Sequence, residues 1–122
     1  MSQTAMPSTA IDLLAAGLAE HRAGDHAAAE RQYRAALDLA PLLPSALHLL
    51  GVLLTETGRA QAACLLLRQA ALLRPGDADI RLALARACAE CGELPVAIAL
   101  LRVVLTERPG DIGLLLGLAH LH

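Results

Sequence analysis

The sequence predicts an all-α protein built from stacked pairs of helices, and three observations support this. Two series of chain-breaking residues share one period of 34 residues, and each glycine lies 17 residues before a proline. The prolines are Pro41, Pro75 and Pro109, and the glycines are Gly24, Gly58 and Gly92. A glycine midway between two prolines divides each period into two helices of ordinary length. Hydrophobic residues form 56% of the chain and aromatic residues 1%, so leucine and alanine dominate and favour helix over sheet.

The period divides the chain into units when each proline is given the thirty-second place of a unit. This assigns a leader to residues 1–9, three repeats to 10–43, 44–77 and 78–111, and the first helix of an incomplete fourth repeat to 112–122. The first helix of each unit is expected over about 10–23, 44–57, 78–91 and 112–122. The second helix is expected over about 26–39, 60–73 and 94–107.

Local signals support the predicted helix ends. Thr9 with Asp12 predicts a capping box at the first helix, and Asp77 and Asp111 are predicted N-caps. Pro95 falls in a first helical turn, where its missing N–H costs little. The midpoint glycines are expected to take the left-handed conformation that ends the first helix of each unit. The periodic prolines are expected to end the second.

Equivalent places of the repeats alternate between small and large residues. The eighth place holds Gly17, Gly51, Ala85 and Ala119, and the twentieth holds Ala29, Ala63 and Ala97. The twenty-fourth place holds Tyr33, Leu67 and Leu101. A small residue on one helix makes room for a large residue on its partner. We expect the eighth and twentieth places to form the close contact within each repeat.

The pattern resembles the tetratricopeptide repeat, and the middle unit carries the resemblance best. Its matching residues are Leu47, Leu50, Gly51, Leu54, Ala63, Leu67, Ala70 and Pro75. Two residues depart from the family pattern: Glu20 stands where tyrosine is favoured, and Arg81 stands where tryptophan is favoured. The resemblance implies a right-handed α-α superhelix of three repeats plus the first helix of a fourth.

The resemblance also implies where a partner binds, because the family holds ligands along the concave groove lined by the first helix of each repeat. The corresponding residues are Leu14, Leu18, Arg22, His48, Val52, Glu56, Leu82, Arg86 and Glu90. One subclass grips a peptide carboxylate with lysine and asparagine, but this chain has Leu14 and Leu18 at those places and contains no lysine. The mixed groove suits an amphipathic helix or apolar peptide. The alternative is a solvated groove whose side chains serve only ordinary packing.

Other classes of partner and site are not expected. The net charge of −2 and the single aromatic residue, Tyr33, leave no basic patch or stacking surface for nucleic acid. The longest uncharged stretch, Leu39 to Thr55, contains two prolines and is shorter than the ~20 apolar residues that cross a bilayer. The first ten residues contain no Lys or Arg, which argues against a secretory signal. Three cysteines form no even set of disulfide partners, which agrees with a reducing compartment. Together these observations lead us to expect a cytoplasmic protein that binds neither nucleic acid nor membrane.

No catalytic residue, cofactor or metal site is predicted. Cys88 and Cys91 form C-x-x-C, but a structural zinc site needs four ligands and no second pair lies at suitable spacing. Cys88 aligns with Leu54, so we interpret it as a packing residue. His120 and His122 are two apart and point away from one another on a helix. No acid–base pair or nucleophile is placed by a motif.

The leading functional hypothesis is therefore a non-enzymatic protein-interaction scaffold, and two alternatives stay open. Residues 112–122 are apolar nearly all round, which predicts self-association through them or a longer protein of which this chain is a fragment. The repeats are similar to arms attached to bacterial glycosyltransferases, sulfotransferases and methyltransferases, which would make the chain a substrate-recognition arm. A small chaperone of a secretion substrate is the other alternative.

Overall fold

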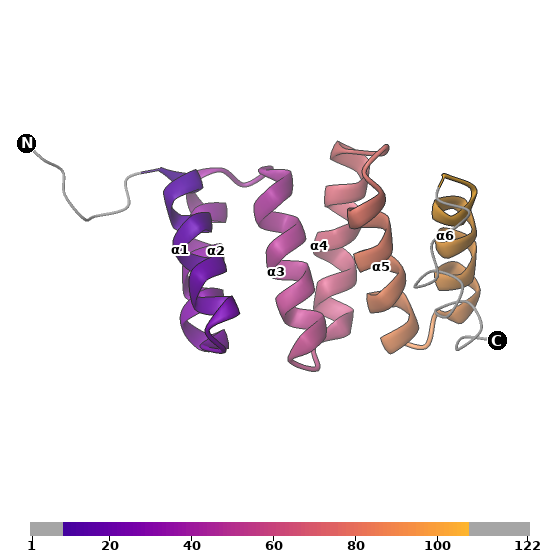
Figure 1. Ribbon diagram of the computed structural model, residues 1–122, viewed down its shortest axis with the longest axis horizontal. Coiled ribbons are helices and arrows are strands. Elements are labelled where there is room, and N and C mark those ends of the chain that lie inside the picture. The colour runs from indigo at the N-terminus through magenta and orange to yellow at the C-terminus, as the bar shows by residue number, and fades with distance from the viewer. Residues whose placement is uncertain (1–8, 108–122) are drawn as a thin grey trace, which may run out of the picture.

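The computed structural model describes residues 9–107, and this part of the chain forms six α-helices with no β-strand. They are α1 (Ala10–Arg22), α2 (His26–Leu39), α3 (Pro44–Glu56), α4 (Ala60–Leu73), α5 (Ala78–Glu90) and α6 (Leu94–Glu107). The helices stand side by side in chain order as antiparallel pairs, so the molecule grows along one axis (Figure 1). The predicted all-α solenoid is confirmed.

The observed helices agree closely with the predicted ranges. Each of the six begins at the predicted residue, and the first helix of each pair ends one residue earlier than predicted. The helix predicted over 112–122 and the N-cap predicted at Asp111 lie outside the described residues. Within residues 9–107, no helix is both long enough and apolar enough to cross a membrane.

The turns that join the two helices of each pair have the same backbone geometry in all three pairs. Gly24, Gly58 and Gly92 have φ angles of 88°, 81° and 86°, as the left-handed prediction required. The residue after each glycine donates its N–H to a carbonyl in the last turn of the helix. These bonds are Asp25 N to Glu20 O at 2.9 Å, Arg59 N to Leu54 O at 2.8 Å, and Glu93 N to Cys88 O at 2.8 Å. Each turn therefore ends one helix and sets the direction of the next.

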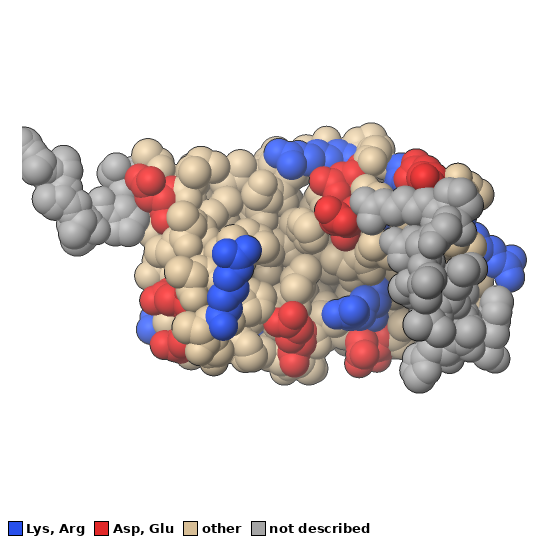
Figure 2. Space-filling model, viewed as in Figure 1, with Lys and Arg blue, Asp and Glu red and all other residues tan. Residues whose placement is uncertain are grey.

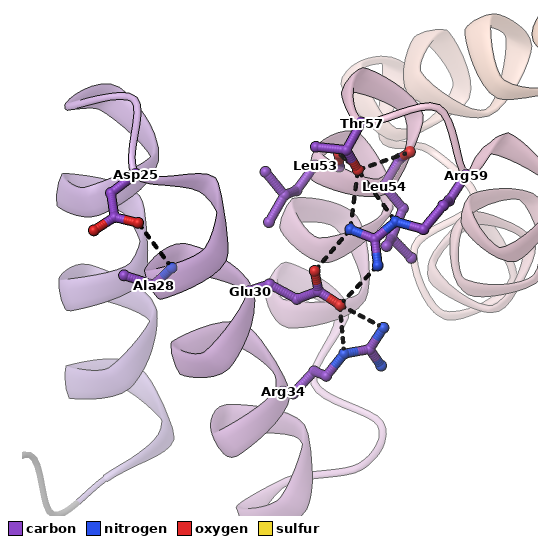
Figure 3. Close-up of polar contacts among 8 residues, drawn as sticks. All are labelled: Asp25, Ala28, Glu30, Arg34, Leu53, Leu54, Thr57 and Arg59. Atoms are coloured by element: carbon purple, nitrogen blue, oxygen red, sulfur yellow. Dashed lines mark hydrogen bonds and ion pairs between the residues drawn. The ribbon is translucent and has the colours of Figure 1, made fainter.

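Three of the helices begin with a side-chain cap. The Thr9 hydroxyl accepts from the N–H of Asp12 at 3.0 Å, which is the Thr9 half of the predicted capping box, and Asp77 accepts from two N–H groups of α5, which confirms its predicted N-cap. Asp25 caps α2 by accepting from the N–H of Ala28 at 3.1 Å, a cap that the sequence interpretation missed (Figure 3). For α3 and α4 no side-chain cap is described.

The close approach within a pair involves the eighth and twenty-fourth places. A Cβ added at Gly17 would lie 2.6 Å from Cε1 of Tyr33, and one added at Gly51 would lie 2.5 Å from Cγ of Leu67. The small eighth place thus makes room for the large residue of the partner helix, and the alanines of the twentieth place are not its nearest neighbours. Tyr33 and Leu67 are completely buried as a result.

The two departures from the family pattern are accommodated differently. Arg81 donates to the carbonyl oxygen of Pro75 and to Oε1 of Glu107, the latter at 2.9 Å, so its guanidinium reaches polar partners while its stem packs inside. Glu20 is half-buried, and its Oε1 atom is buried without a hydrogen-bond partner among the described residues.

Candidate binding face

The nine residues predicted to line a groove all lie on α1, α3 and α5, and we call this surface the A-helix face. Contacts of α1 with α3 and of α3 with α5 place the three helices side by side. They lie toward the viewer in Figure 1, and the same face in Figure 2 is largely uncharged, with its charged side chains set apart. The part of this face that Figure 2 shows is therefore a largely uncharged surface with scattered charges.

The exposure of the nine side chains divides them into three groups. Leu14 is buried, with 6% of its surface exposed, and packs in the core. Leu18, His48, Val52 and Leu82 are half-buried. Arg22, Glu56, Arg86 and Glu90 are exposed. Leu18, Val52 and Leu82 supply one half-buried apolar side chain from each of the three helices, whereas Leu14 offers a partner little surface.

A polar bridge connects the first two repeats on this face. His21 Nε2 lies 2.6 Å from Oε1 of Glu56, and His21 Nδ1 lies 3.0 Å from the hydroxyl of Tyr33. A carboxylate only accepts, so in the neutral imidazole Nε2 carries the hydrogen and the buried Tyr33 O–H donates to Nδ1. Burial and the nearby Glu56 carboxylate raise the pKa of Tyr33. Glu56 is thus held in place by His21, a partner that the sequence interpretation did not assign to it.

His48 lies on α3 beside the start of α5. Burial lowers the pKa of its imidazole, and this effect outweighs the nearby carboxylates of Asp77 and Asp79, which act in the opposite direction. The lowered pKa favours the neutral imidazole over the charged one, so burial favours His48 as an uncharged hydrogen-bonding group on the A-helix face.

Away from this face, a cluster of polar side chains connects α2 to the turn before α4, and we call it the first junction (Figure 3). Arg59 Nη2 donates to Oε1 of Glu30 at 2.7 Å and Arg59 Nη1 donates to Oε2 at 3.1 Å, while Arg34 Nε donates to Oε2 at 2.9 Å. Arg59 also donates to the hydroxyl of Thr57. The hydrogen bonds from Arg59 lower the pKa of Glu30.

The residues 34 positions further along form a different cluster between α4 and the turn after α5, which we call the second junction. Sγ of Cys64 lies 3.4 Å from Sγ of Cys91, and Arg68 Nη2 donates to Oε1 of Glu93 at 2.6 Å. The thiols of Cys64 and Cys88 and the carboxylate of Glu93 lie within 4.8 Å of one another. Burial, with further contributions from the hydrogen bond to Cys91 and the neighbouring thiols, raises the pKa of Cys64 to about 12.

Sequence reasoning weighed Cys88 and Cys91 for metal binding but did not connect them to Cys64. Cys64 is separated from the C-x-x-C pair by a loop and most of α5. The 34-residue period could have predicted the approach of Cys64 to this pair. Glu30 and Thr57 of the first junction are the equivalents of Cys64 and Cys91. Glu30 of α2 contacts Arg59 in the turn before α4, and Cys64 of α4 contacts Cys91 in the turn before α6, so contacts between the second helix of one repeat and the turn inside the next recur every 34 residues.

Comparison with known proteins identifies the repeat. A family model described as tetratricopeptide repeat matches residues 54–118. A mutant O-GlcNAc transferase of Thermobaculum terrenum is 33% identical with a TM-score of 0.85, and the alignment covers 95% of this chain but only 23% of that one. No curated protein sequence matches the chain.

Two further solved structures are similar at lower sequence identity. The first TPR of Spaghetti (RPAP3), solved with an HSP90 peptide, is 17% identical with a TM-score of 0.87, and the alignment covers 93% of this chain and 90% of that one. MamA from Desulfovibrio magneticus RS-1 is 21% identical with a TM-score of 0.86, covering 92% of this chain and 63% of that one. At these identities the likeness is one of fold.

Proposed function

Because the chain belongs to the tetratricopeptide repeat family, we propose that it is a protein-interaction scaffold that binds a partner peptide or helix on the A-helix face. The supporting observation is the presence of half-buried Leu18, Val52 and Leu82 on three neighbouring helices. These side chains form an incomplete apolar surface that a partner can cover. The proposed role is recognition, with no catalytic residue among those described.

The residues of the face favour one chemistry of partner. Similar structures were solved with HSP90 and HSP70 peptides. In this chain, the places of the carboxylate clamp hold Leu14 and Leu18, and the sequence contains no lysine. We therefore propose an amphipathic helix or apolar peptide whose hydrophobic side chains lie against Leu18, Val52 and Leu82. Arg22, Arg86, Glu56 and Glu90 surround this track and would set the register of a partner that carries both charges.

The test uses two substitutions that add the same charge to opposite sides of the molecule. Helical peptides would be selected from a random library on the full chain, and their affinity measured by fluorescence anisotropy. Val52→Glu buries a carboxylate under the bound peptide and should weaken binding by about tenfold or more. Leu72→Glu, on the 82%-exposed Leu72 of α4, should leave affinity unchanged.

Circular dichroism must show that both variants keep the wild-type helix content. Unchanged affinity in a folded Val52→Glu variant would place the partner elsewhere and contradict the proposed face. An equal loss in both variants would indicate a nonspecific effect of charge, which also contradicts it.

A second candidate function is a substrate-recognition arm of a larger transferase. The observation that favours it is the 33% identity to the O-GlcNAc transferase across 95% of this chain, which spans less than a quarter of that protein. The test is the genomic reading frame after His122. An open frame that encodes a nucleotide-binding pattern supports the arm, whereas a stop codon supports the separate scaffold.

A further inference from the structure

The second junction brings three potential metal ligands, Cys64, Cys88 and Glu93, within 4.8 Å of one another, and a fourth, Cys91, lies 3.4 Å from Cys64. Cys64 comes from the middle of α4, Cys88 from the last turn of α5, Cys91 from the C-cap of α5, and Glu93 from the turn that follows. Four ligands at a tetrahedral Zn²⁺ with ~2.3 Å Zn–S bonds place their sulfur atoms about 3.8 Å apart. The 3.4 Å between the Cys64 and Cys91 sulfur atoms is close to that value, and the separations within 4.8 Å among Cys64, Cys88 and Glu93 are compatible with it.

The backbone holds three of these residues in fixed relation to one another. The N–H of Cys91 donates to the carbonyl of Ala87 at 3.0 Å, and the N–H of Glu93 donates to the carbonyl of Cys88 at 2.8 Å. Gly92, with φ of 86°, makes the turn between Cys91 and Glu93. Cys88 and Cys91 also have the C-x-x-C spacing common in zinc sites. The ligands are thus arranged by a helix end and a tight turn, and the Cys91 side chain would have to turn toward Cys88 and Glu93 to complete a four-ligand site.

Arg68 supplies a charge that such a site requires. Three thiolates and one carboxylate around Zn²⁺ leave an excess of two negative charges. The Arg68 guanidinium donates to Oε1 of Glu93 at 2.6 Å, so it offsets part of that excess. The second oxygen of the Glu93 carboxylate can serve the ion.

The first junction shows that the fold does not need sulfur at these places. Glu30, Leu54 and Thr57 occupy there the positions of Cys64, Cys88 and Cys91, and the helices pack with an ion-pair network instead. Packing alone explains Cys88, because it takes the place that the leucine Leu54 has in the preceding repeat. It does not explain why the other two cysteines of the chain lie at the same junction, with Cys64 within 4.8 Å of Cys88 and 3.4 Å from Cys91.

From this convergence we propose that Cys64, Cys88 and Cys91, with Glu93 as the fourth ligand, bind one Zn²⁺ ion per chain at the second junction. Binding replaces the three thiol protons, which leave to solvent. Glu93 is exposed and Cys91 is half-buried, so the ion enters from the turn, while Cys64 and Cys88 lie buried beneath. The ion links α4 to α5 and so stiffens the contact between the second and third repeats.

The direct test is a titration of the full chain with Co²⁺ alone, after reduction and removal of metals with a chelator. Reduction is required because the close Cys64 and Cys91 thiols can oxidise to a disulfide. We expect thiolate-to-cobalt charge-transfer absorption and tetrahedral visible bands that saturate at one equivalent. One equivalent of Zn²⁺ should then displace them and raise the thermal midpoint of unfolding.

Matched variants assign the site. Cys91→Thr installs the residue that the chain itself carries at the equivalent Thr57, so it should fold and bind Zn²⁺ at least about tenfold more weakly. Cys64→Ala should abolish the charge-transfer band. His26→Ala is the control, because His21, His26 and Glu56 form the other described group of potential ligands within 4.8 Å. This control should bind like the wild type.

Two results would overturn the proposal. One is a reduced wild-type chain that shows no charge-transfer band at one equivalent of Co²⁺. The other is metal binding that is lost in His26→Ala and unchanged in Cys91→Thr, which would assign the ion to the histidine group.

Discussion

At the scale of single residues, the close approach of paired helices depends on the absence of one methyl group. Gly51 sits inside α3, where glycine is a poor helix former by about 1 kcal/mol relative to alanine. It is nevertheless suited to its place because a Cβ there would lie 2.5 Å from Cγ and 2.7 Å from Cδ2 of Leu67. The contact involves the branch point of a buried leucine, which cannot move aside freely. Packing therefore outweighs helix propensity here.

This balance predicts that the effect of Gly51→Ala on the free energy of unfolding changes sign when Leu67 is also replaced by alanine. Gly51→Ala alone should lower the free energy of unfolding by about 1–2 kcal/mol, because overpacking exceeds the gain in propensity. In a Leu67→Ala background, the same Gly51→Ala change should raise the free energy of unfolding. Urea unfolding followed by circular dichroism measures both, and equal effects in the two backgrounds would contradict the packing explanation.

A second prediction at this scale concerns the first junction and pH. The Arg59 contact lowers the pKa of Glu30 below its usual 4.5, so the stabilisation is complete above that value and is lost as pH falls through the lowered pKa. Glu30→Gln should therefore cost about 0.5–1 kcal/mol at pH 7, and this cost should shrink as pH falls below 4.5 through the lowered pKa. Parallel curves of stability against pH for the two proteins would show that Glu30 does not contribute through its charge.

At the scale of elements, the three glycine turns are interchangeable because each repeats one backbone geometry. A Cβ added at Gly58 would meet no atom within 4 Å, so the obstacle to alanine there is its φ of 81°. Gly58 therefore tests backbone conformation alone, whereas at Gly51, inside α3, the obstacle to a side chain is packing.

The loss of stability on substituting Gly58 should thus depend on how costly the left-handed conformation is for the new residue. Gly58→Ala is expected to lower the free energy of unfolding by about 1–2 kcal/mol, and Gly58→Asn by less, because asparagine adopts this conformation more readily. Thermal unfolding of the two variants gives the ranking. A more stable alanine variant would show that the turn relaxes to another geometry.

The elements also show which features could be predicted from sequence. Helix ends were predictable because Thr9, Asp77 and the three glycines act within a few residues of their own position. The bridge from His21 to Glu56 and the approach of Cys64 to Cys91 join residues 35 and 27 positions apart, which no local signal specifies. The pairing of the eighth with the twenty-fourth place was missed for a related reason. Small and large places are visible in sequence, but which of them face one another depends on how the paired helices are rotated.

At the scale of the whole molecule, each repeat packs on its neighbours, so contacts between distant repeats contribute little. Such a solenoid leaves apolar surface wherever no neighbour covers it. The sequence of residues 112–122 is apolar nearly all round, and this segment lies outside the described residues, so its role stays a prediction.

We expect the chain to self-associate through 112–122. Light scattering at high concentration should give a mass above 12.7 kDa, and Leu115→Glu together with Leu118→Glu should reduce it toward that of one chain. Leu72→Glu, which adds a charge to exposed α4, is the control and should leave the mass unchanged. A monodisperse wild-type monomer would contradict this expectation.

The burial of Tyr33 has a consequence for how unfolding can be observed. The chain has no tryptophan, so Tyr33 is the source of its intrinsic fluorescence, and this fluorophore lies completely buried in the first repeat beside His21. Its emission therefore reports the first repeat, whereas far-ultraviolet circular dichroism reports all helices together. If the repeats unfold as one unit, the two signals share a midpoint. Separate midpoints would locate the boundary between cooperative units within this solenoid, and no label would have to be added.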